Sequence, residues 1–495
     1  MLAQATSAAL LGIEAFEVRV EADIANGLPH LLIVGLPGAA VQESRERVRA
    51  ALQNAELPFP MRRVVINLAP ADVRKEGPAF DLPIALALLL AQRALPPDSL
   101  TSTICVGELA LDGELRPVRG AVSIGLLAQA AGARRVIVPP GNAPEVASVA
   151  GIDVVAPRSL AESVRFLRGV IALAPVEPPP PVRGPPGPDF AEVKGQAGAK
   201  RALEVAAAGG HNLLMTGPPG AGKTMLATRL PGIMPDLLTG EAVEASRVLS
   251  ATGLPARGLS VRPPFRQPHH TISYAGLIGG GGSPRPGEVS LAHNGVLHLD
   301  EFSEFNRTAL EALRQPLEDG VVTISRARGS LTFPARFLLI ASRNPCLCGY
   351  SGDPAHVCIC SPALLRRYRD RISGPLLDRI DLRITVPRVP PEDVLRSPGG
   401  PSSAAIRARV VRSRQTALER QGSTNARLTA AALRRYCSLD ASCESFARHV
   451  IGRLSMSGRG FDRLLRVART IADLSGSRRI CEEHLAEAVS YRDDY

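Results

Sequence analysis

A glycine-rich segment in the middle of the chain has the composition of a phosphate-binding loop. It follows an apolar stretch expected to form a strand, residues 212–216, and precedes residues of helical composition. In such a loop the backbone amides surround phosphate oxygens, Lys223 reaches the β- and γ-phosphates, and the Thr224 hydroxyl binds Mg²⁺. The alternative is an ordinary glycine-rich turn. The predicted ATP-binding residues are Gly217, Pro218, Pro219, Gly220, Ala221, Gly222, Lys223, Thr224 and Met225.

Two adjacent carboxylates follow a second short apolar stretch. Asp300 and Glu301 come directly after residues 295–299, which are expected to form a strand. Asp300 in this place can hold the Mg²⁺ shell, and Glu301 can polarise the water that attacks ATP. An Asp-Glu pair alone is more often a solvated strand end. Together with the phosphate-binding loop it predicts an ATP hydrolase.

Two further polar side chains are suited to phosphoryl chemistry. Asn344 lies just beyond a third apolar stretch, residues 337–341, and can hydrogen-bond the γ-phosphate or the attacking water. The alternative is a turn-forming asparagine before a proline. Arg379 lies between Asp378 and Asp381, and an arginine can stabilise the spread charge of a transferring phosphoryl group, often in a neighbouring subunit. A surface ion pair is the competing interpretation.

Four of the eight cysteines lie within fifteen residues of one another. Cys346, Cys348, Cys358 and Cys360 form two CxC pairs that can offer four thiolates to tetrahedral Zn²⁺. His356 could replace one of them. We therefore expect a structural zinc site, with reduced, unligated thiols as the alternative. The other cysteines are scattered along the chain and are expected to be ordinary buried thiols.

Basic residues concentrate in two places. Arg326 and Arg328 are expected at the tip of a hairpin formed by residues 321–333, where they are candidate contacts to DNA phosphates. A solvated turn is the alternative. A helical stretch, residues 406–420, adds a second basic surface that could also face DNA, although most charged helix faces are only solvated. Its arginines are Arg407, Arg409, Arg412, Arg414 and Arg420.

Length and charge set limits on these interpretations. The chain has 495 residues and a net charge of +11, which favours a polyanionic partner such as nucleic acid or an anionic membrane. The longest apolar run, residues 82–91, is about half the roughly 20 residues that span a bilayer, so no membrane segment is expected. The first residues lack the basic region of a signal peptide, which predicts a cytoplasmic protein. With 4% aromatic residues and no tryptophan, aromatic stacking is not the expected binding device.

The elements that must position these residues indicate an α/β protein. Residues 16–24, 31–36 and 64–68 have strand patterns, and residues 39–54 have a helical one. Eight prolines between residues 175 and 188 mark a linker, with a proline-rich ligand as the alternative, and a polar break covers residues 397–403. We expect an α/β domain at 1–172, a linker at 173–189, a parallel-sheet core at 190–390 that holds the cysteines, and a helical region at 391–495.

The motifs described above resemble those of the AAA+ ATPases, and within them the magnesium-chelatase-like proteins of the YifB/ComM family. The blocks that carry the resemblance extend over nearly the whole chain. They include GLPGAAVQESRERVRAAL, NLAPADVRKEG, FDLPIAL, AAAGGHNLLMTGPPGAGKT, FRQPHHTIS, PGEVSLAHNGVLHLDE, SGPLLDRID and RVARTIADL. One departure is His298, which stands where an apolar residue is usual in the strand before the carboxylates. His269 and His270 could coordinate a metal, but a structural or DNA-proximal role is expected.

The resemblance implies a Lon-protease-like (S5-like) N-terminal α/β domain, a central AAA+ P-loop parallel-sheet module and a C-terminal helical lid, assembled as a homohexameric ring. It implies that Arg379 is an arginine finger, Asn344 is sensor 1, and Arg459 is sensor 2, with Arg463 and Arg466 as nearby rivals. The hairpin with Arg326 would face the ring pore. The first domain lacks a serine at the Lon nucleophile position, so no peptidase activity is expected.

The resemblance also implies a DNA motor. The family's better-studied members are helicases that promote branch migration in recombination during natural transformation, so single-stranded or branched DNA and recombination proteins are the expected partners. The alternative is a chelatase-type ATPase that remodels a protein partner for metal insertion. That alternative is weaker because the Lon-like domain is present and no integrin-type metal-binding segment is visible.

Overall fold

The computed structural model describes residues 2–149, 151–184, 187–254, 258–282, 284–326, 329–390, 392, 400–454 and 456–492. The chain forms two compact units. The first contains Met1–Arg183, Thr239–Val261 and Ala327–Leu331. The second contains Gly184–Leu238, Arg262–Arg326 and Thr332–Tyr495.

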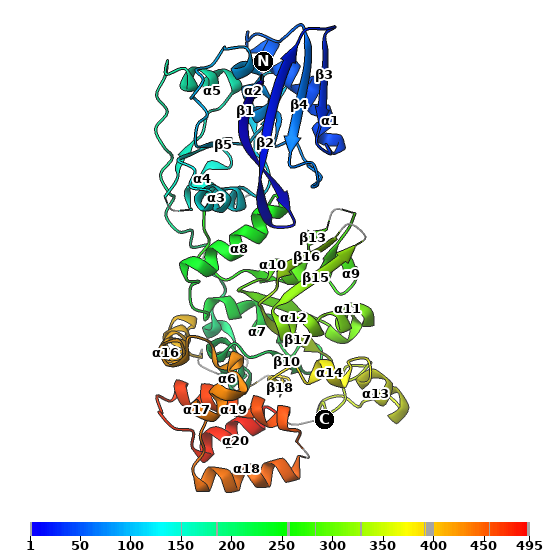
Figure 1. The fold of residues 1–495 in the computed structure, drawn as a ribbon. Coiled ribbons are helices and arrows are strands. Elements are labelled where there is room, and N and C mark those ends of the chain that lie inside the picture. The colour runs from blue at the N-terminus through cyan, green and yellow to red at the C-terminus, as the bar shows by residue number, and fades with distance from the viewer. Residues whose placement is uncertain are drawn as a thin grey trace. The chain divides into compact units, whose positions relative to one another are not determined.

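The first unit is built on a mixed seven-stranded sheet (Figure 1). A long antiparallel hairpin lies in its middle, and α2 (Asp81–Ala91), an almost wholly apolar helix, is buried against it. In β2 the residues Val18, Val20 and Ala22 alternate inward, which is the period of a strand with one buried face. The strand order is β3 (His30–Val34), β4 (Arg63–Ala69), β2 (Glu14–Ala25), β1 (Leu2–Leu11), β5 (Thr103–Cys105), β8 (Arg135–Ile137) and β9 (Asp153–Val155).

A helix from the middle of the sequence completes this first unit. α8 (Thr239–Thr252) packs on α3 (Ala121–Ala130). The carbonyl of Ser250 accepts a hydrogen bond from Gly120 N at 2.9 Å, and its hydroxyl donates to Glu145. Arg247 pairs with Glu14 at 3.4 Å. The range expected to form the ATPase core, residues 190–390, therefore contributes a helix to the N-terminal unit.

The second unit contains the phosphate-binding loop. Its five strands are all parallel and follow the order β11 (Phe265–Arg266), β14 (Val296–Leu299), β17 (Leu338–Arg343), β10 (Leu213–Thr216) and β18 (Leu382–Thr385). β10, β14 and β17 are buried along their whole length, as expected for a sheet covered on both faces. This is the parallel-sheet AAA+ module that the sequence predicts.

The C-terminal region of the chain is helical, as predicted. They share one apolar core with α6 (Ala197–Gly209) and the five-stranded sheet. Figure 1 shows them grouped at the C-terminal end of the second unit. They are α16 (Ser403–Gln421), α17 (Ala430–Tyr436), α18 (Ala441–Arg453), α19 (Gly458–Leu474) and α20 (Glu482–Ser490).

Two short hairpins lie beside each other. β15 (Val321–Arg326) pairs with β16 (Gly329–Pro334), and β12 (Gly279–Gly280) pairs with β13 (Arg285–Pro286). A Cβ placed on Gly280 would lie 3.6 Å from Arg326 Nη2, so the backbone of one hairpin closely approaches the arginine of the other. Arg328, the second expected DNA contact, lies outside the described residues.

Among the helices in the described ranges, none combines the length and the apolar character that a membrane crossing requires.

Candidate active site

The predicted catalytic residues leave the parallel sheet at one edge. In the sheet, Thr216 of β10 lies opposite Arg343 of β17, and Leu299 of β14 lies opposite Ala341. The residues that follow these three strands therefore emerge side by side at their carboxyl ends, where open parallel sheets place ligand sites. They are the phosphate-binding loop, Asn344 and Asp300.

The phosphate-binding loop depends on glycine at two positions. A Cβ on Gly217 would lie 2.2 Å from the carbonyl oxygen of Val386, so no side chain fits there. Gly222 has a φ of +89°, in the left-handed region that favours glycine. It directly precedes α7 (Lys223–Arg229), so the start of the helix faces the loop. A helix N-terminus with free amide groups attracts phosphate.

Lys223 is folded into the loop. Its Nζ donates to the carbonyl oxygens of Gly217 at 2.7 Å and Pro218 at 3.0 Å, and to Asn344 Oδ1 at 3.2 Å. Burial lowers the pKa of Lys223, and the negative charges of Asp300 and Glu301 partly offset this effect. The structure thus brings the expected phosphate-binding lysine and the expected sensor asparagine into direct contact.

Asp300 is held by two hydroxyl groups. Thr224 Oγ1 donates to Asp300 Oδ2 at 2.5 Å, and Ser342 Oγ donates to Asp300 Oδ1 at 2.5 Å. Burial would raise the pKa of Asp300, but these two hydrogen bonds, together with smaller contributions that include the Glu301 amide, lower the pKa below its usual value. A hydroxyl and an ionised carboxylate at this distance are hard oxygen ligands of the kind that Mg²⁺ prefers. The donor set therefore fits the predicted Mg²⁺ site.

Glu301 is held away from the phosphate-binding loop by a histidine. Its backbone is left-handed, with a φ of +53°, and its Oε2 lies 2.9 Å from His270 Nδ1. The His270 ring also stacks on His269, with 4.2 Å between ring centroids. The sequence suggested metal coordination, or a structural or DNA-proximal role, for this histidine pair, but not contact with Glu301. The missed signal is position: His270 follows β11, the strand next to the one that ends at Asp300 and Glu301.

His298 fits inside the sheet despite its polarity. Its ring lies 6.0 Å from the Phe265 ring, and its Nε2 lies 3.4 Å from Ser342 Oγ. Burial lowers its pKa to about 4, so the ring is neutral at physiological pH. Because Ser342 also donates to Asp300, this histidine packs behind the Mg²⁺ site without disturbing the strand.

The expected arginine finger and the expected sensor 2 gather at one place. Arg379 forms an ion pair with Glu318, and Arg379 Nη1 donates to Pro375 O at 2.8 Å. This pair lowers the pKa of Glu318, with smaller contributions from the charges of Arg459 and Arg463. Among the described contacts none joins Arg459 to the phosphate-binding loop. Arg466, the other rival for sensor 2, donates instead to Leu428 O at 3.1 Å.

The four predicted zinc ligands form one cluster. The sulfur atoms of Cys346, Cys348, Cys358 and Cys360 all lie within 4.8 Å of one another. The backbone amide of Tyr350 is the main cause that lowers the pKa of Cys348 to about 6. Four sulfur ligands at this spacing fit a tetrahedral Zn²⁺ site. His356 stacks on Tyr350 at 4.6 Å and lies 3.4 Å from Asp353, outside the cluster.

The arginines of α16 mostly have partners inside the same unit. Four of the five arginines predicted there contact this unit's own side chains or carbonyls, and only Arg412 has none among the described residues. The expectation that this helix offers its charge to DNA is therefore wrong for those four. The partners are Asp236 for Arg407, Glu204 for Arg409, the Ala207 carbonyl for Arg414, and Asp473 for Arg420.

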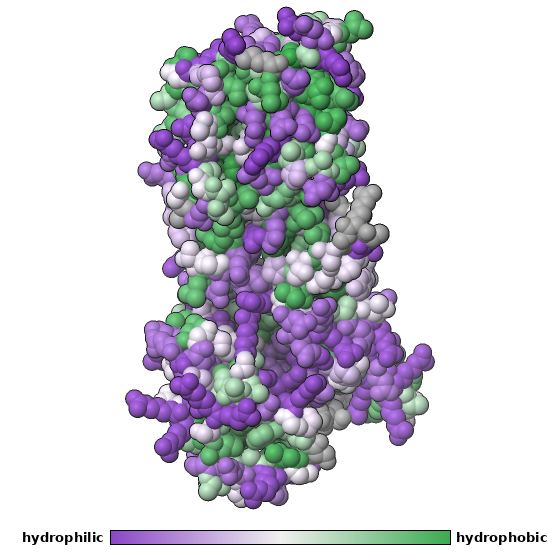
Figure 2. Space-filling model, in the orientation of Figure 1, coloured by the Kyte–Doolittle hydropathy of each residue, from purple (hydrophilic) through white to green (hydrophobic). Residues whose placement is uncertain are grey.

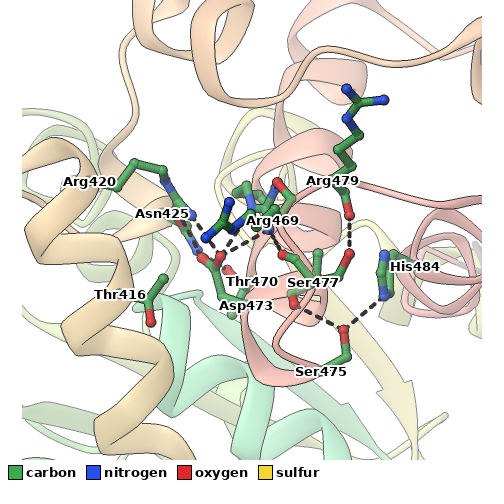
Figure 3. Close-up of polar contacts among 12 residues, drawn as sticks. Thr416, Arg420, Asn425, Arg469, Thr470, Asp473, Ser475, Ser477, Arg479 and His484 are labelled. Atoms are coloured by element: carbon green, nitrogen blue, oxygen red, sulfur yellow. Dashed lines mark hydrogen bonds and ion pairs between the residues drawn. The ribbon is translucent and has the colours of Figure 1, made fainter.

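A buried polar network joins these helices to the sheet, and Figure 3 shows its helical part around Asp473. Asp473 accepts from Arg420 at 2.7 and 2.9 Å and from Asn425 at 2.8 Å. Asn425 Nδ2 also donates to Thr470 Oγ1 at 3.1 Å. That hydroxyl lies 2.7 Å from His211 Nε2, whose Nδ1 is 3.2 Å from Asp381 Oδ2. The network ends at Asp381, two residues from Arg379, the expected arginine finger.

Comparison with known proteins gives consistent matches along the chain. Three family profiles match: magnesium chelatase subunit ChlI at residues 189–394, subunit ChlI of Mg-chelatase at 20–142, and the ChlI C-terminal region at 400–492. The protein YifB of Escherichia coli (strain K12) is 44% identical over 487 residues, which cover 98% of this chain and 96% of YifB. The competence protein ComM of Haemophilus influenzae is 43% identical over 503 residues, which cover 99% of this chain and 97% of ComM.

Proposed function

Because this chain belongs to the magnesium-chelatase (ChlI-like) family of AAA ATPases, together with YifB and ComM, we propose that it is a Mg²⁺-ATP-dependent DNA motor. In this proposal it is a hexameric helicase that promotes branch migration of recombining DNA during natural transformation. It works in the cytoplasm on single-stranded or branched DNA, together with recombination proteins.

One observation supports ATP hydrolysis most strongly. Lys223, Thr224, Asp300 and Asn344 come from three different strand ends, yet their side chains form two hydrogen-bonded pairs, Lys223 with Asn344 and Thr224 with Asp300, which are adjacent because Lys223 and Thr224 are neighbours in the chain. Such preorganised charge and hydrogen-bond donors provide most of what phosphoryl transfer requires. Mg²⁺ bound at Thr224 and Asp300 would neutralise charge on the ATP phosphates.

Each side chain then has a role. Lys223 exchanges its carbonyl contacts for phosphate oxygens, and Asn344, which now contacts Lys223, is placed to orient the attacking water. Glu301 leaves His270 and accepts the proton of that water. A general base in this position typically contributes 10²–10⁴-fold to the rate, about 3–5 kcal/mol.

The arginines near Glu318 fit a role in ATP hydrolysis at the contact between two subunits. Arg379 and Arg459 share Glu318 as a neighbouring charge. In a ring, Arg379, Arg459 and Arg463 of one subunit would face the ATP of the next, where guanidinium groups stabilise the transition state. A homohexamer is the assembly that we propose.

The hairpin formed by β15 and β16 supports DNA as the substrate. Arg326 is exposed, and in the part of the chain that the structure describes no carboxylate is paired with it. A free cation at a hairpin end fits phosphate contacts that are independent of sequence and sensitive to salt. The relative ComM is a competence protein, which favours the same substrate class.

A chelatase-type activity is the second candidate, because the matching profiles bear the name of a magnesium chelatase subunit. There the same ATPase would remodel a protein partner for metal insertion. A protein substrate, in contrast to DNA, would not require free cations at the hairpin.

Unwinding of a forked DNA by the full chain tests the proposal. We expect ATP-dependent strand separation at low salt that weakens at high salt, and no separation by Lys223→Ala. Arg326→Ala should weaken DNA binding, whereas Arg448→Ala, an exposed arginine of α18, should leave it unchanged. Neither binding nor unwinding of any DNA would overturn the proposal and leave the chelatase-type candidate.

A further inference from the structure

The loop held by the four cysteines presents apolar side chains to solvent. Val357 and Ile359 alternate with Cys358 and Cys360, and their exposed fractions are 88% and 86%. Leu347, from the other CxC pair, is 59% exposed. Since the sulfur cluster fixes the backbone on both sides, these side chains cannot withdraw into a core. Apolar groups held in solvent in this way usually mark a contact surface.

A basic helix continues directly from this loop. α13 (Pro362–Arg369) begins two residues after Cys360 and is anchored by the buried Tyr368. At 100° per residue, Arg366 points opposite Tyr368, while Arg367 and Arg369 flank it on either side. All three arginines are exposed, and within the described ranges none forms an ion pair. In Figure 2 the surface in the region of α13 is mostly hydrophilic, with smaller hydrophobic patches between the hydrophilic side chains.

The exposed apolar side chains of the loop and the unpaired arginines of α13 together favour one kind of partner for this surface. Guanidinium groups without acidic partners attract phosphates, and exposed aliphatic side chains can insert at unstacked bases. A second copy of this chain would instead have to offer carboxylates to three arginines. Charge complementarity therefore favours nucleic acid.

We propose that the cysteine loop and α13 form a DNA-junction surface, separate from the Arg326 hairpin. Val357 and Ile359 contact bases where two strands part, and Arg366, Arg367 and Arg369 contact the flanking phosphates. The inference deepens the proposed DNA motor and rests on it.

The base of the same loop adjoins the ATP site. Cys346 follows Asn344 by two residues, and a Cβ on Gly349 would lie only 2.7 Å from Pro219 Cδ. The cysteine loop thus packs on the phosphate-binding loop. DNA held on this surface would be coupled to the ATP site through direct packing.

Fluorescence of 2-aminopurine at the junction of a forked DNA tests this surface. With a non-hydrolysable ATP analogue, the wild-type chain should raise the fluorescence as bases unstack. The double variant Val357→Ser, Ile359→Ser should lose this rise but still bind single-stranded DNA. Arg366→Glu with Arg367→Glu should weaken fork binding about tenfold at low salt and reduce the salt slope by about two. The matched controls, Arg448→Glu on α18 and Leu454→Ser directly after that helix, should behave as wild type.

The outcomes separate the two proposals. If the wild-type chain binds no DNA, the proposed motor function fails. If it binds DNA but both double variants give the wild-type junction signal, only the junction surface is overturned. If the variants retain ATP affinity but no longer assemble as the wild type does in sedimentation, the surface is a contact between copies of the chain, and the inference is likewise overturned.

Discussion

Glu301 is the residue whose geometry bears most directly on catalysis. Its carboxylate contacts His270, a residue outside the predicted set, at 2.9 Å. Lys223 already contacts Asn344, and Thr224 already contacts Asp300. ATP binding and proton abstraction therefore depend on separate side chains, and a substitution can separate them.

We predict that Glu301→Gln binds ATP as wild type does and hydrolyses it at least about 100-fold more slowly, because an amide cannot accept the proton. Binding of a fluorescent ATP analogue and release of phosphate measure the two properties. Equal turnover in the variant would show that another group is the base.

The cysteine cluster makes a second prediction at this scale. Protein purified without chelator should contain about one Zn²⁺ per chain, because four thiolates within 4.8 Å of one another can hold one tetrahedral ion. Cys358→Ser with Cys360→Ser should abolish the metal, whereas Cys105→Ser, a buried cysteine of the first unit, should keep it. Metal analysis showing less than about half an ion per wild-type chain would contradict the site.

At the scale of elements, local motifs were predictable and distant partners were not. The strand, loop and helix around Lys223 follow from composition, because the glycines, the lysine and the apolar strand are contiguous. The first strand, β1, was not predicted, since Ala and Ser dilute its alternation. The arginines of α16 were misjudged because their partners, such as Glu204 and Asp473, lie far away in the sequence. For the same reason no local pattern reveals that α8 packs on the N-terminal unit.

The end of the helical region contains a pH-sensitive cap. His484 Nδ1 accepts a hydrogen bond from Cys481 N at 3.0 Å at the start of α20, and its Nε2 lies 2.9 Å from Ser475 Oγ (Figure 3). Burial, and then the positive charge of Arg469, lower the pKa of His484 in the folded chain. The unfolded chain therefore binds the proton more readily than the folded chain does. The contribution of neutral His484 to the free energy of unfolding is complete above about pH 6.5 and declines as the pH falls.

We predict that His484→Gln removes this dependence, since glutamine at the third helical position can cap without titrating. Melting temperatures between pH 7.5 and pH 5.5 should fall less for this variant than for wild type. His449→Gln, an exposed histidine of α18, should follow the wild-type curve. If the melting temperatures of wild type and His484→Gln fell equally with pH, the His484 cap would not be the cause of the pH dependence.

At the scale of the whole molecule, the cations that give the net charge of +11 have different structural roles. Arginines of α16 hold helices to the sheet, and Arg379, Arg459 and Arg463 cluster near Glu318. Among the described residues, Arg326 and the three arginines of α13 belong to the exposed cations that form no ion pair. Net charge alone favours a polyanionic partner in general, and the structure shows which cations are already paired.

The ring assembly is testable with two inactive variants. Lys223→Ala should lack ATP binding but keep its arginine finger, and Arg379→Ala should bind ATP but lack the finger. We predict that each alone is inactive and that mixing them restores measurable hydrolysis, because intact sites arise between unlike subunits. A mixture that stays inactive, although it assembles, would place Arg379 in the site of its own subunit.

The central claim is that DNA controls ATP hydrolysis by this chain. It is tested most directly by the steady-state ATPase rate of the full chain with and without forked DNA at low salt, with Glu301→Gln as the background. The account predicts a rate that rises severalfold on addition of DNA and returns toward the basal value as salt weakens the phosphate contacts. An ATPase rate that is the same with and without DNA at every salt concentration would contradict it.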